Sequence, residues 1–383
     1  MGPVAESPEW GILMRPPGTP PAWRGPLVEL DRWEWRDGDP GEPAVLLADF
    51  LAAHGLGGEL AGQRGDTAVA LLAGAAGCAR IAGLPAGRRS PVPAVPEVVA
   101  VAYRRGGGDA AGLPASGGVS DWTASWTDGE HAAAIEVVRE AIGRGEVYQA
   151  NVVGHRVAPH RSDPRALAAA VATLPGATYG GVLAGSGWAV GCASPEQLVR
   201  VDAGRITTVP IKGTLRVAPG SREELLASVK DRAEHVMIVD LERNDLSRVA
   251  RTGSVQVEQL YAMTDWSGLW QAASTVAAVL QDGVGVADVL AALLPGGSVT
   301  GAPKRAACEL LAELEPVGRG PSMGALGLLW PGGLDLGLTI RTVGVSADEI
   351  HLWAGGGITW GSEAAAEVDE AHAKAEPVLR ALA

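Results

Sequence analysis

The chain has 383 residues and a formal net charge of −13 at pH 7, with 47% hydrophobic and 20% charged residues. This balance excludes an intrinsically disordered chain and supplies enough apolar sequence for one large domain or two ordinary ones. The acidic charge, with no basic stripe, argues against a nucleic-acid partner, so an anionic substrate would have to be bound by local cations or a metal ion.

Cysteine usage and the N-terminal sequence bear on the cellular compartment. Cys78, Cys192 and Cys308 are far apart and form neither a metal-binding spacing nor a disulfide framework. We therefore expect a reducing, cytoplasmic setting. The first thirty residues lack the apolar core of a signal peptide, and the apolar run over 68–83 is too short to span a bilayer. No association with a membrane is expected.

The first 120 residues give the weaker structural signals. An apolar run predicts a helix over 43–55, and a strand is predicted over 98–103 after a proline-broken linker. Glycine-rich residues 106–118 are expected to form a loop.

From residue 127 onward the signals are sharper. Thr127 and Glu130 have the spacing of a capping box, which predicts a helix that stops near Gly145. Strands are predicted over 147–157, 179–184, 188–193, 198–211, 255–263 and 271–281, with three more before a last helix from about 363. Further helices are predicted from 164, from 221, over 231–249, up to 294 and over 303–314. Strands that arrive in consecutive groups separated by helices predict an α+β protein with large antiparallel sheets.

Lys212 is a candidate functional residue because lysine is scarce in this chain. Of the 31 basic residues only four are lysines. Arginine can serve as a generic surface cation, whereas a lysine can lose its proton and act as a nucleophile. Lys212 follows a strand-like run over 205–211 and precedes a Gly-Thr turn. A surface lysine at the end of a strand is the alternative interpretation.

The predicted last helix carries a group of charges on one side. Glu367, Glu370 and Lys374 are three and four residues apart, so they project within about 60° of one another, beside an apolar stripe. A surface ion pair worth a few tenths of a kcal/mol and the edge of a binding site both fit this pattern. Pro377 could kink or end the helix.

Four other positions could bind a ligand. Residues 295–304 form a glycine-rich loop before a helix, which suits an anion or simply a tight turn. Arg341 lies within an apolar strand, and a buried arginine needs an anion from a substrate or from a salt bridge. Residues 354–358 permit close approach of a ligand or a neighbouring strand. Glu234 lies on a partly apolar helix, where a solvated acid is the simpler interpretation.

Taken together, six ordered segments resemble the chorismate-utilising enzymes, the family of anthranilate, aminodeoxychorismate, isochorismate and salicylate synthases. The segments are PIKGT, KDRAEHVMIVDLERNDLSRV, PGGSVTGAPK, TIRT, AGGGI and the E-x-x-E-x-x-x-K ending. The resemblance begins at about residue 125. It implies a large two-sheet antiparallel α/β sandwich that encloses the active site. Residues 121–383 would form the chorismate-binding catalytic region, and residues 1–120 a divergent N-terminal region that contributes to the sandwich.

The resemblance also implies roles for single residues. The acids that would bind Mg²⁺ are Glu234 and Glu370, with Glu367 beside them. The surroundings of the two substrate carboxylates would be Arg341, Gly355, Gly356, Gly357, Ser298, Thr300 and Lys374. Oxygen ligands and one hard cation suit a dianionic substrate in an acidic protein.

Two positions bear on which reaction of the family to expect. Gln149 stands where the isochorismate and salicylate enzymes have a lysine that activates water, and glutamine cannot act as a base. Lys212 stands where the anthranilate and isochorismate branches typically have alanine. In aminodeoxychorismate synthases this lysine is understood to attack C2 of chorismate before ammonia adds at C4. Glu196 matches the acid that can protonate the departing hydroxyl, and we count Thr214 of the same PIKGT motif with this catalytic group.

We therefore expect aminodeoxychorismate synthase component I chemistry. Anthranilate synthesis and 2-amino-2-deoxyisochorismate synthesis are the alternatives, and a non-catalytic chorismate-binding subunit is a more distant one. Gln271, where anthranilate synthases carry a histidine, is a further difference from that branch. Neither Cys78 nor Cys192 lies in the Gly-x-Cys-x-Gly pattern of a glutaminase. A separate glutamine amidotransferase subunit is thus the expected source of ammonia.

Overall fold

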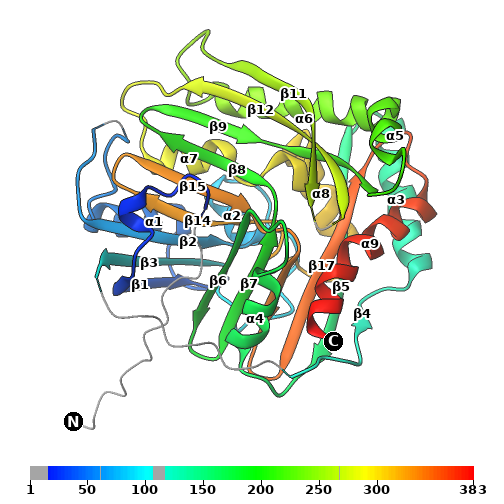
Figure 1. Cartoon of the computed structure of the whole chain (residues 1–383), viewed down its shortest axis with the longest axis horizontal. Helices are drawn as coiled ribbons and strands as arrows, with labels where there is room; N and C mark the ends of the chain where they lie inside the picture. Colours follow the sequence, from blue (N-terminus) through cyan, green and yellow to red (C-terminus); the bar gives the residue numbers. More distant parts are fainter. Residues whose placement is uncertain (1–15, 61, 107–116, 267) are drawn as a thin grey trace.

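The computed structural model describes residues 16–60, 62–106, 117–266 and 268–383. Two large antiparallel sheets lie against each other, with helices on their outer sides (Figure 1). The predicted α+β class with antiparallel sheets is therefore confirmed. None of the helices in the described ranges combines the length and the hydropathy that a bilayer crossing requires.

Within the described residues the larger sheet has ten strands, and all of its pairings are antiparallel. Nine strands follow one another across the sheet, and the tenth, β11, pairs with β12. In spatial order they are β1 (Leu27–Trp35), β3 (Val98–Arg105), β2 (Thr67–Ala73), β14 (Ala325–Trp330), β15 (Gly333–Leu338), β8 (Gln197–Asp202), β9 (Arg205–Val209), β12 (Leu269–Val279) and β10 (Ile211–Arg216), with β11 at Gln256–Trp266.

The smaller sheet has seven strands among the described residues. Its long central pair, β5 and β17, is joined over ten successive residue pairs from Glu349↔Pro159 to Ile358↔Ala150. The spatial order is β13 (Gly301–Ala302), β5 (Gln149–Pro159), β17 (Glu349–Ile358), β16 (Thr342–Val345), β7 (Trp188–Ser194) and β6 (Tyr179–Gly185), with β4 (Thr123–Ala124) also on β5.

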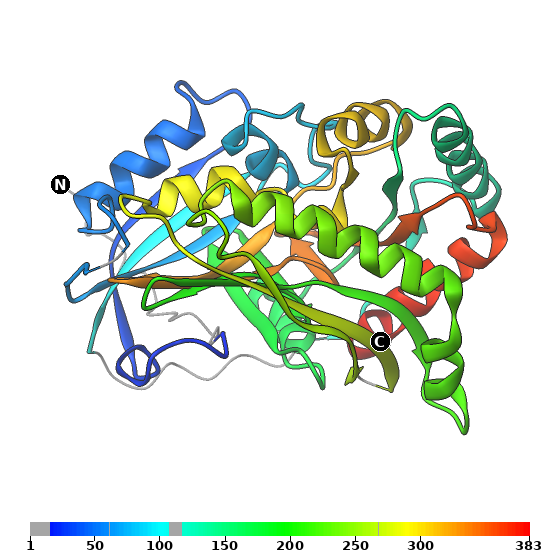
Figure 2. The ribbon, with the colours of Figure 1, turned by 90° about the horizontal axis from the view of Figure 1, so that it is seen from above.

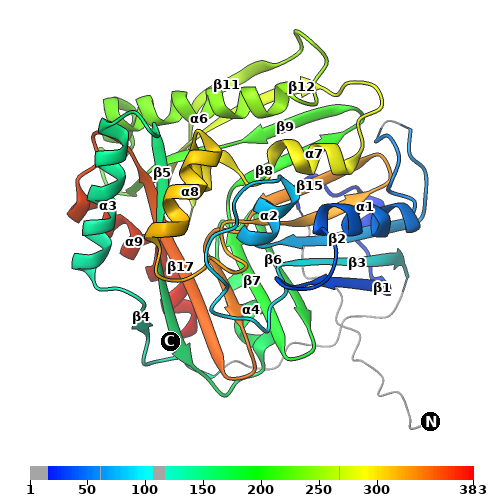
Figure 3. The ribbon, with the colours of Figure 1, turned by 180° about the vertical axis from the view of Figure 1, so that it is seen from behind.

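The helices cover the outer sides of the sheets. Seen from above, α1, α7 and α6 follow one side of the larger sheet (Figure 2). From behind, α2 and α8 lie on that same side of the molecule (Figure 3), whereas α4 and α9 pack on β7 and β17 of the smaller sheet. The bounds are α1 Pro43–Ala53, α2 Ala75–Ile81, α3 Asp128–Gly143, α4 Pro164–Ala172, α5 Ser221–Ala227, α6 Val229–Ser247, α7 Val286–Leu293, α8 Lys304–Leu314 and α9 Ala364–Leu382, with short 3₁₀ turns η1 (Pro21–Trp23) and η2 (Gly297–Val299).

Local sequence signals placed the start and end of α3 correctly. The Thr127 hydroxyl accepts a hydrogen bond from the Glu130 N–H, and the Glu130 carboxylate accepts one from the Thr127 N–H. This is the predicted capping box, which satisfies two of the N–H groups that have no partner within the helix. The helix ends before Gly145, whose φ of +78° suits glycine.

The predicted strand over 198–211 is wrong in detail. A turn at Ala203 and Gly204, both with positive φ, separates β8 from β9. Pro210, which has no N–H to donate, separates β9 from β10. Lys212 consequently lies inside β10 rather than at the end of a strand, and the expected Gly-Thr turn is a β-bulge at Gly213.

Two other predictions need correction near the C-terminus. Four strands, β14 to β17, precede the last helix in the described chain where three were predicted. The helix itself continues through Pro377 to Leu382. Proline removes one helical hydrogen bond, but the apolar stripe on both sides of it is buried, as at Ala375 and Val378. Packing of that stripe outweighs the missing bond.

We predict that Gly191→Ala destabilises the protein. A Cβ at Gly191 in β7 would lie 2.2 Å from the Ala168 carbonyl oxygen of α4, so the helix would have to move off the sheet. Overpacking of this kind costs about 1–3 kcal/mol, which chemical denaturation would measure. Gly25→Ala is the matched control because a Cβ there meets nothing within 4 Å. Equal stabilities of the two variants would contradict the close packing of α4 on β7.

Candidate active site

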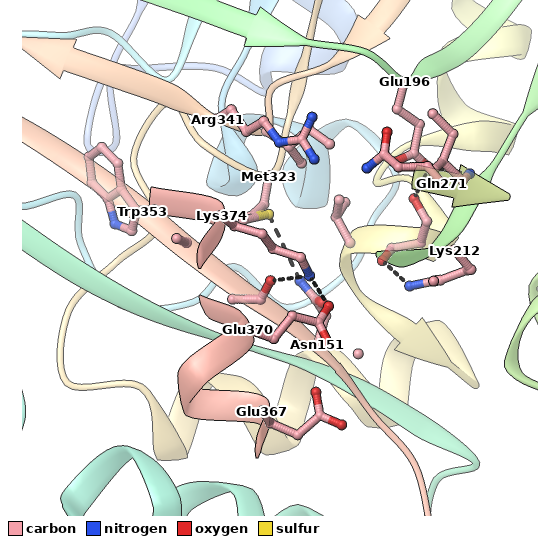
Figure 4. Close-up of a pocket in the computed structure, with 18 of the residues that line it drawn as sticks. Asn151, Glu196, Lys212, Gln271, Met323, Arg341, Trp353, Glu367, Glu370 and Lys374 are labelled. Atoms are coloured by element: carbon pink, nitrogen blue, oxygen red, sulfur yellow. Dashed lines mark hydrogen bonds and ion pairs between the residues drawn. The ribbon is translucent and has the colours of Figure 1, made fainter. Parts of the chain in front are cut away.

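One pocket lies between the two sheets and collects most of the predicted site residues (Figure 4). Its walls come from β10 and β12 of the larger sheet, β5 and β17 of the smaller sheet, and from α6, α9 and η2. The predicted residues that line it are Glu196, Lys212, Glu234, Ser298, Arg341, Gly355, Gly357, Glu367, Glu370 and Lys374. Segments separated by more than 150 residues in sequence thus meet at one place.

Lys212 reaches this pocket from β10. The register shift at Gly213 lies directly beside it, and bulges commonly redirect a side chain next to a site. Its Nζ donates a hydrogen bond to the Ser298 carbonyl oxygen at 3.0 Å. Burial lowers the pKa of the Lys212 amine, the carboxylates of Glu234 and Glu196 oppose this, and the Lys374 ammonium lowers it further. The arrangement favours an amine that can be neutral.

Glu196, in the connection between β7 and β8, is a buried acid close to Lys212. It is 5% exposed, and its Oε1 accepts hydrogen bonds from the Ser298 hydroxyl at 2.7 Å and from the Ile211 N–H at 3.2 Å. Burial raises the pKa of Glu196, while the Ser298 hydroxyl and the Lys212 charge lower it in part. Such a carboxyl group can hold a proton and donate it.

Arg341 brings a buried cation to the opposite wall. It does not lie within a strand, as the sequence predicted, but between β15 and β16, with φ of +52°, and it is 5% exposed. Burial lowers the pKa of Arg341 to about 9, and the Glu196 carboxylate opposes that shift. In Figure 4 its guanidinium points into the same space as Lys374, with Glu367 at the far end. A planar guanidinium in this position is suited to bind a carboxylate.

The acids of α9 and α6 form the other end of the pocket. Glu367 is 4% exposed, and Glu370 pairs with the Lys374 ammonium at 2.7 Å. Lys374 also donates to the Gly355 carbonyl oxygen at 2.9 Å. Glu234 Oε1 accepts a hydrogen bond from the Thr359 hydroxyl at 3.1 Å. The charges that the sequence placed beside an apolar stripe therefore line a pocket, with Glu367 buried and Glu370 and Lys374 partly exposed.

The carboxylates fit a magnesium ion by their chemistry but do not form a cage. Within the described residues no three His, Cys, Asp or Glu side chains lie close enough together to hold a metal ion. Mg²⁺ usually takes one or two protein carboxylates and completes its shell with water and substrate oxygens. Glu234 and Glu370 line the same pocket and could act in that way.

Gln149 lies next to Lys212 although it does not line the pocket. It is fully buried, and both amide atoms have no hydrogen-bond partner within the described chain. A Cβ built on Gly357 would lie 2.2 Å from Gln149 Nε2 and 3.2 Å from Lys212 Nζ. Glycine at 357 is therefore what allows this amide and this amine to approach the same backbone.

Three other predicted residues have different surroundings. Gly356 adjoins the acids, since a Cβ there would lie 3.3 Å from Glu367 Oε2. The Thr300 hydroxyl donates to the Gly296 carbonyl oxygen at 2.8 Å, and Thr300 lines a second cavity rather than this pocket. Thr214 lies in β10, and its side chain is outside the described part of the structure.

Sequence reasoning missed Asn151, Met323 and Trp353, which also line the pocket. Asn151 Nδ2 lies 3.9 Å from the Met323 sulfur. Met323 falls in an irregular segment before β14, where no periodicity marks it. Lys304, part of the glycine-rich segment, turns away and pairs with the buried Asp245 of α6 at 2.6 Å. It joins α8 to α6 instead of facing a ligand.

Comparison with known proteins finds related sequences. A family model described as chorismate binding enzyme matches residues 101–380. The chain is 38% identical over 281 residues to anthranilate synthase component 1 of Streptomyces coelicolor, covering 71% of this chain and 55% of that one. It is 36% identical over 270 residues to aminodeoxychorismate synthase component 1 of Escherichia coli K12, covering 69% and 60%. The aligned part thus spans somewhat more than half of each relative.

Solved structures show the same fold. Anthranilate synthase component I from Streptococcus pneumoniae superposes with a TM-score of 0.78 at 22% identity, covering 93% of this chain and 92% of that one. The menaquinone-specific isochorismate synthase from Escherichia coli gives a TM-score of 0.66 at 18% identity, covering 94% and 95%. The two-sheet sandwich predicted from sequence is therefore confirmed.

We predict that Lys212 reacts with amine-directed reagents at lower pH than an ordinary lysine. Competitive acetylation over a pH series, followed by peptide mass spectrometry, would give its titration midpoint. Glu234→Gln should lower that midpoint further, because the Glu234 carboxylate raises the pKa of Lys212. Exposed Glu313→Gln is the control for the charge change. A midpoint at or above that of a model lysine, about 10.4, would show that the pocket does not lower the pKa of Lys212.

Proposed function

Because the chain belongs to the chorismate-binding enzyme family, whose model matches residues 101–380, we propose that it converts chorismate and ammonia to 4-amino-4-deoxychorismate. This is the reaction of an aminodeoxychorismate synthase component I. The observation that carries the proposal is the position of Lys212, a pocket lysine with a lowered pKa beside a neutral Gln149. A nucleophilic amine is present, and the neighbouring side chain cannot activate water as a base.

In the proposed first step the Lys212 amine attacks C2 of chorismate. The C2–N bond forms, the ring double bond shifts, and the C4 hydroxyl leaves as water with a proton from Glu196. Ammonia then adds at C4, the double bond shifts back, and the C2–N bond breaks as Lys212 leaves. The added nitrogen gives up one proton, which restores Glu196. The net change replaces a 4-hydroxyl group by a 4-amino group and releases one water. The hydrogen bond from Lys212 to the Ser298 carbonyl supports this role, because a neutral amine can donate it and keep its lone pair.

The proposed binding of the two substrate carboxylates uses both ends of the pocket. Arg341 lines the pocket with a buried guanidinium and would pair with one carboxylate. The second would lie near Lys374 and the backbone of β17, where Gly355 and Gly357 leave space. When bound, Mg²⁺ would supply positive charge for a substrate carboxylate, with Glu234 and Glu370 holding it and Glu367 beside them.

The proposed reaction needs ammonia, and the partner we propose is a separate glutamine amidotransferase subunit. Two relatives whose names carry "component 1" are consistent with a second component. Free ammonium at alkaline pH should replace it in vitro. A separate lyase would then release 4-aminobenzoate from the product.

Anthranilate synthesis is the second candidate, favoured by the 38% identity to the Streptomyces coelicolor anthranilate synthase component. Both reactions use chorismate and ammonia and differ in the carbon that is aminated. The residue that separates them in our proposal is Lys212, since direct amination at C2 needs no enzyme amine at that carbon. A related alternative, 2-amino-2-deoxyisochorismate synthesis, also places nitrogen at C2.

The product identifies the reaction. We predict that the protein with chorismate, Mg²⁺, ammonium and a 4-amino-4-deoxychorismate lyase releases 4-aminobenzoate. Lys212→Ala should reduce kcat at least about 10³-fold, as expected for loss of a nucleophile. Lys212→Arg should do the same, because arginine keeps the charge but does not become neutral.

Other outcomes are equally clear. Fluorescent anthranilate formed without lyase would contradict amination at C4. Mg²⁺-dependent binding of chorismate without turnover would indicate a non-catalytic subunit. Full activity of Lys212→Ala would exclude the covalent step and leave the overall reaction in place.

We predict that Ser298→Ala moves the pH optimum of kcat upward. Its hydroxyl stabilises the ionised form of Glu196, so its removal raises the pKa of that acid. The protonated form of Glu196 then persists to higher pH. Rates should be compared at constant free ammonia, so that ionisation of the co-substrate does not shape the profile. Ser298→Thr keeps the hydroxyl and is the control. An unchanged pH optimum would mean that Glu196 does not donate a proton in the rate-limiting step.

A further inference from the structure

A second cavity adjoins the active-site pocket on the side of α2 and α8. It is enclosed by these two helices, by the segment from Pro85 to Glu97 and by residues 315–323. Met323 lines both cavities, so the two meet at its side chain. Thr300, whose hydroxyl is turned from the active-site pocket, lines the second cavity as well.

Glu97 is the unusual side chain of this cavity. It is 6% exposed, and among the described residues its carboxylate has neither a hydrogen bond nor an ion pair. Its backbone is fixed on both sides, since its N–H donates to the Trp35 carbonyl and its own carbonyl accepts from the Gly74 N–H. Burial raises the pKa of Glu97 to about 7, and the nearby Asp37 adds to the shift. A buried carboxyl group without a partner is costly, which makes a functional reason for it worth testing.

The cations near Glu97 are engaged elsewhere. Arg319 pairs with Glu315 at 2.7 Å, and it also donates to backbone carbonyls of η2 and β5. Arg88 donates to a carbonyl of α8. Asp37 pairs with Arg80 at 3.1 Å and with Arg89 at 3.6 Å. Glu97 therefore offers an acceptor that no side chain of the described structure uses.

We propose that this cavity admits the ammonium co-substrate, with Glu97 binding the ion and Met323 forming the boundary to the chorismate pocket. The inference rests on the proposed function only in requiring ammonia, which amination at C4 and amination at C2 both do. Ammonium is a small cation with N–H donors, and it suits an unpaired carboxylate in a confined space.

Glu97 also provides a place for the proton that ammonium must lose before it can attack a carbon. One N–H bond of the ion breaks, the proton passes to the Glu97 carboxylate, and neutral ammonia keeps the electron pair. Ammonia can then pass the thioether of Met323, where a charged ion would be poorly solvated. Glu97 returns its proton to water before the next ion binds, so Glu97 is restored and one proton is released to water for each ammonium ion used.

The test is the ammonium dependence of chorismate turnover by the full chain. Glu97→Gln should raise KM for ammonium about tenfold or more, through loss of a charge-assisted contact. Its KM for chorismate should stay within about twofold. Glu97→Asp, which keeps the charge, should recover part of the ammonium affinity. Glu313→Gln on the exposed side of α8 is the control for the change in net charge. Melting of Glu97→Gln should not be lowered, because the substitution removes an unpaired buried carboxyl group.

An unchanged KM for ammonium in Glu97→Gln would overturn the inference. Anthranilate as the product would contradict the proposed amination at C4. The KM for ammonium of Glu97→Gln relative to the wild type would still decide whether the cavity binds ammonium. If the wild type shows no turnover, thallous ion, which is similar in size to ammonium, provides a second measurement in crystals. An anomalous peak beside Glu97 that disappears in Glu97→Gln supports the cation site. No peak, or a peak that persists in Glu97→Gln, which would mark an adventitious ion only, overturns it.

Discussion

The hydrogen bonds of Ser298 hold the centre of this site together. Its carbonyl accepts the Lys212 amine and its hydroxyl donates to the Glu196 carboxyl group, so one residue of η2 fixes the distance between a base and an acid. Neither contact is local in sequence. The first requires β10 of the larger sheet and the second requires the connection between β7 and β8 to lie against η2. The elements of the two-sheet sandwich must therefore pack correctly for the site to have this geometry.

Burial shifts the pKa values of the two partners of Ser298 in opposite directions. Removing a charge from water disfavours the ammonium form of Lys212 and the carboxylate form of Glu196. Both groups are pushed toward their neutral forms, which are the forms that the proposed mechanism requires. The charges of Glu234 and Lys374 act on Lys212 in opposite directions and partly cancel. Desolvation, rather than any single neighbouring charge, is thus the main cause of both pKa shifts.

The sequence was informative where function depends on residue type and order, and weaker where it depends on register. Short motifs located Lys212 and the acids of α9, and the capping box located α3. The motifs could not show that Lys212 lies inside β10, because the Pro210 break and the Gly213 bulge are set by pairing with a strand about 60 residues later. Met323 and Glu97 carry no pattern at all. Both lie in irregular segments, and tertiary packing alone brings Met323 to the active-site pocket and Glu97 to the cavity beside it.

Gln149 and Lys212 are best understood as a pair. The two side chains approach Gly357 from different sheets, within a space where a Cβ would meet both. A lysine at 149 would place a second ammonium beside Lys212, and like charges in a buried site push one of the two toward the neutral form. The neutral amide avoids this competition. Under the proposed function, Lys212 would then act as a nucleophile without a second lysine beside it to activate water.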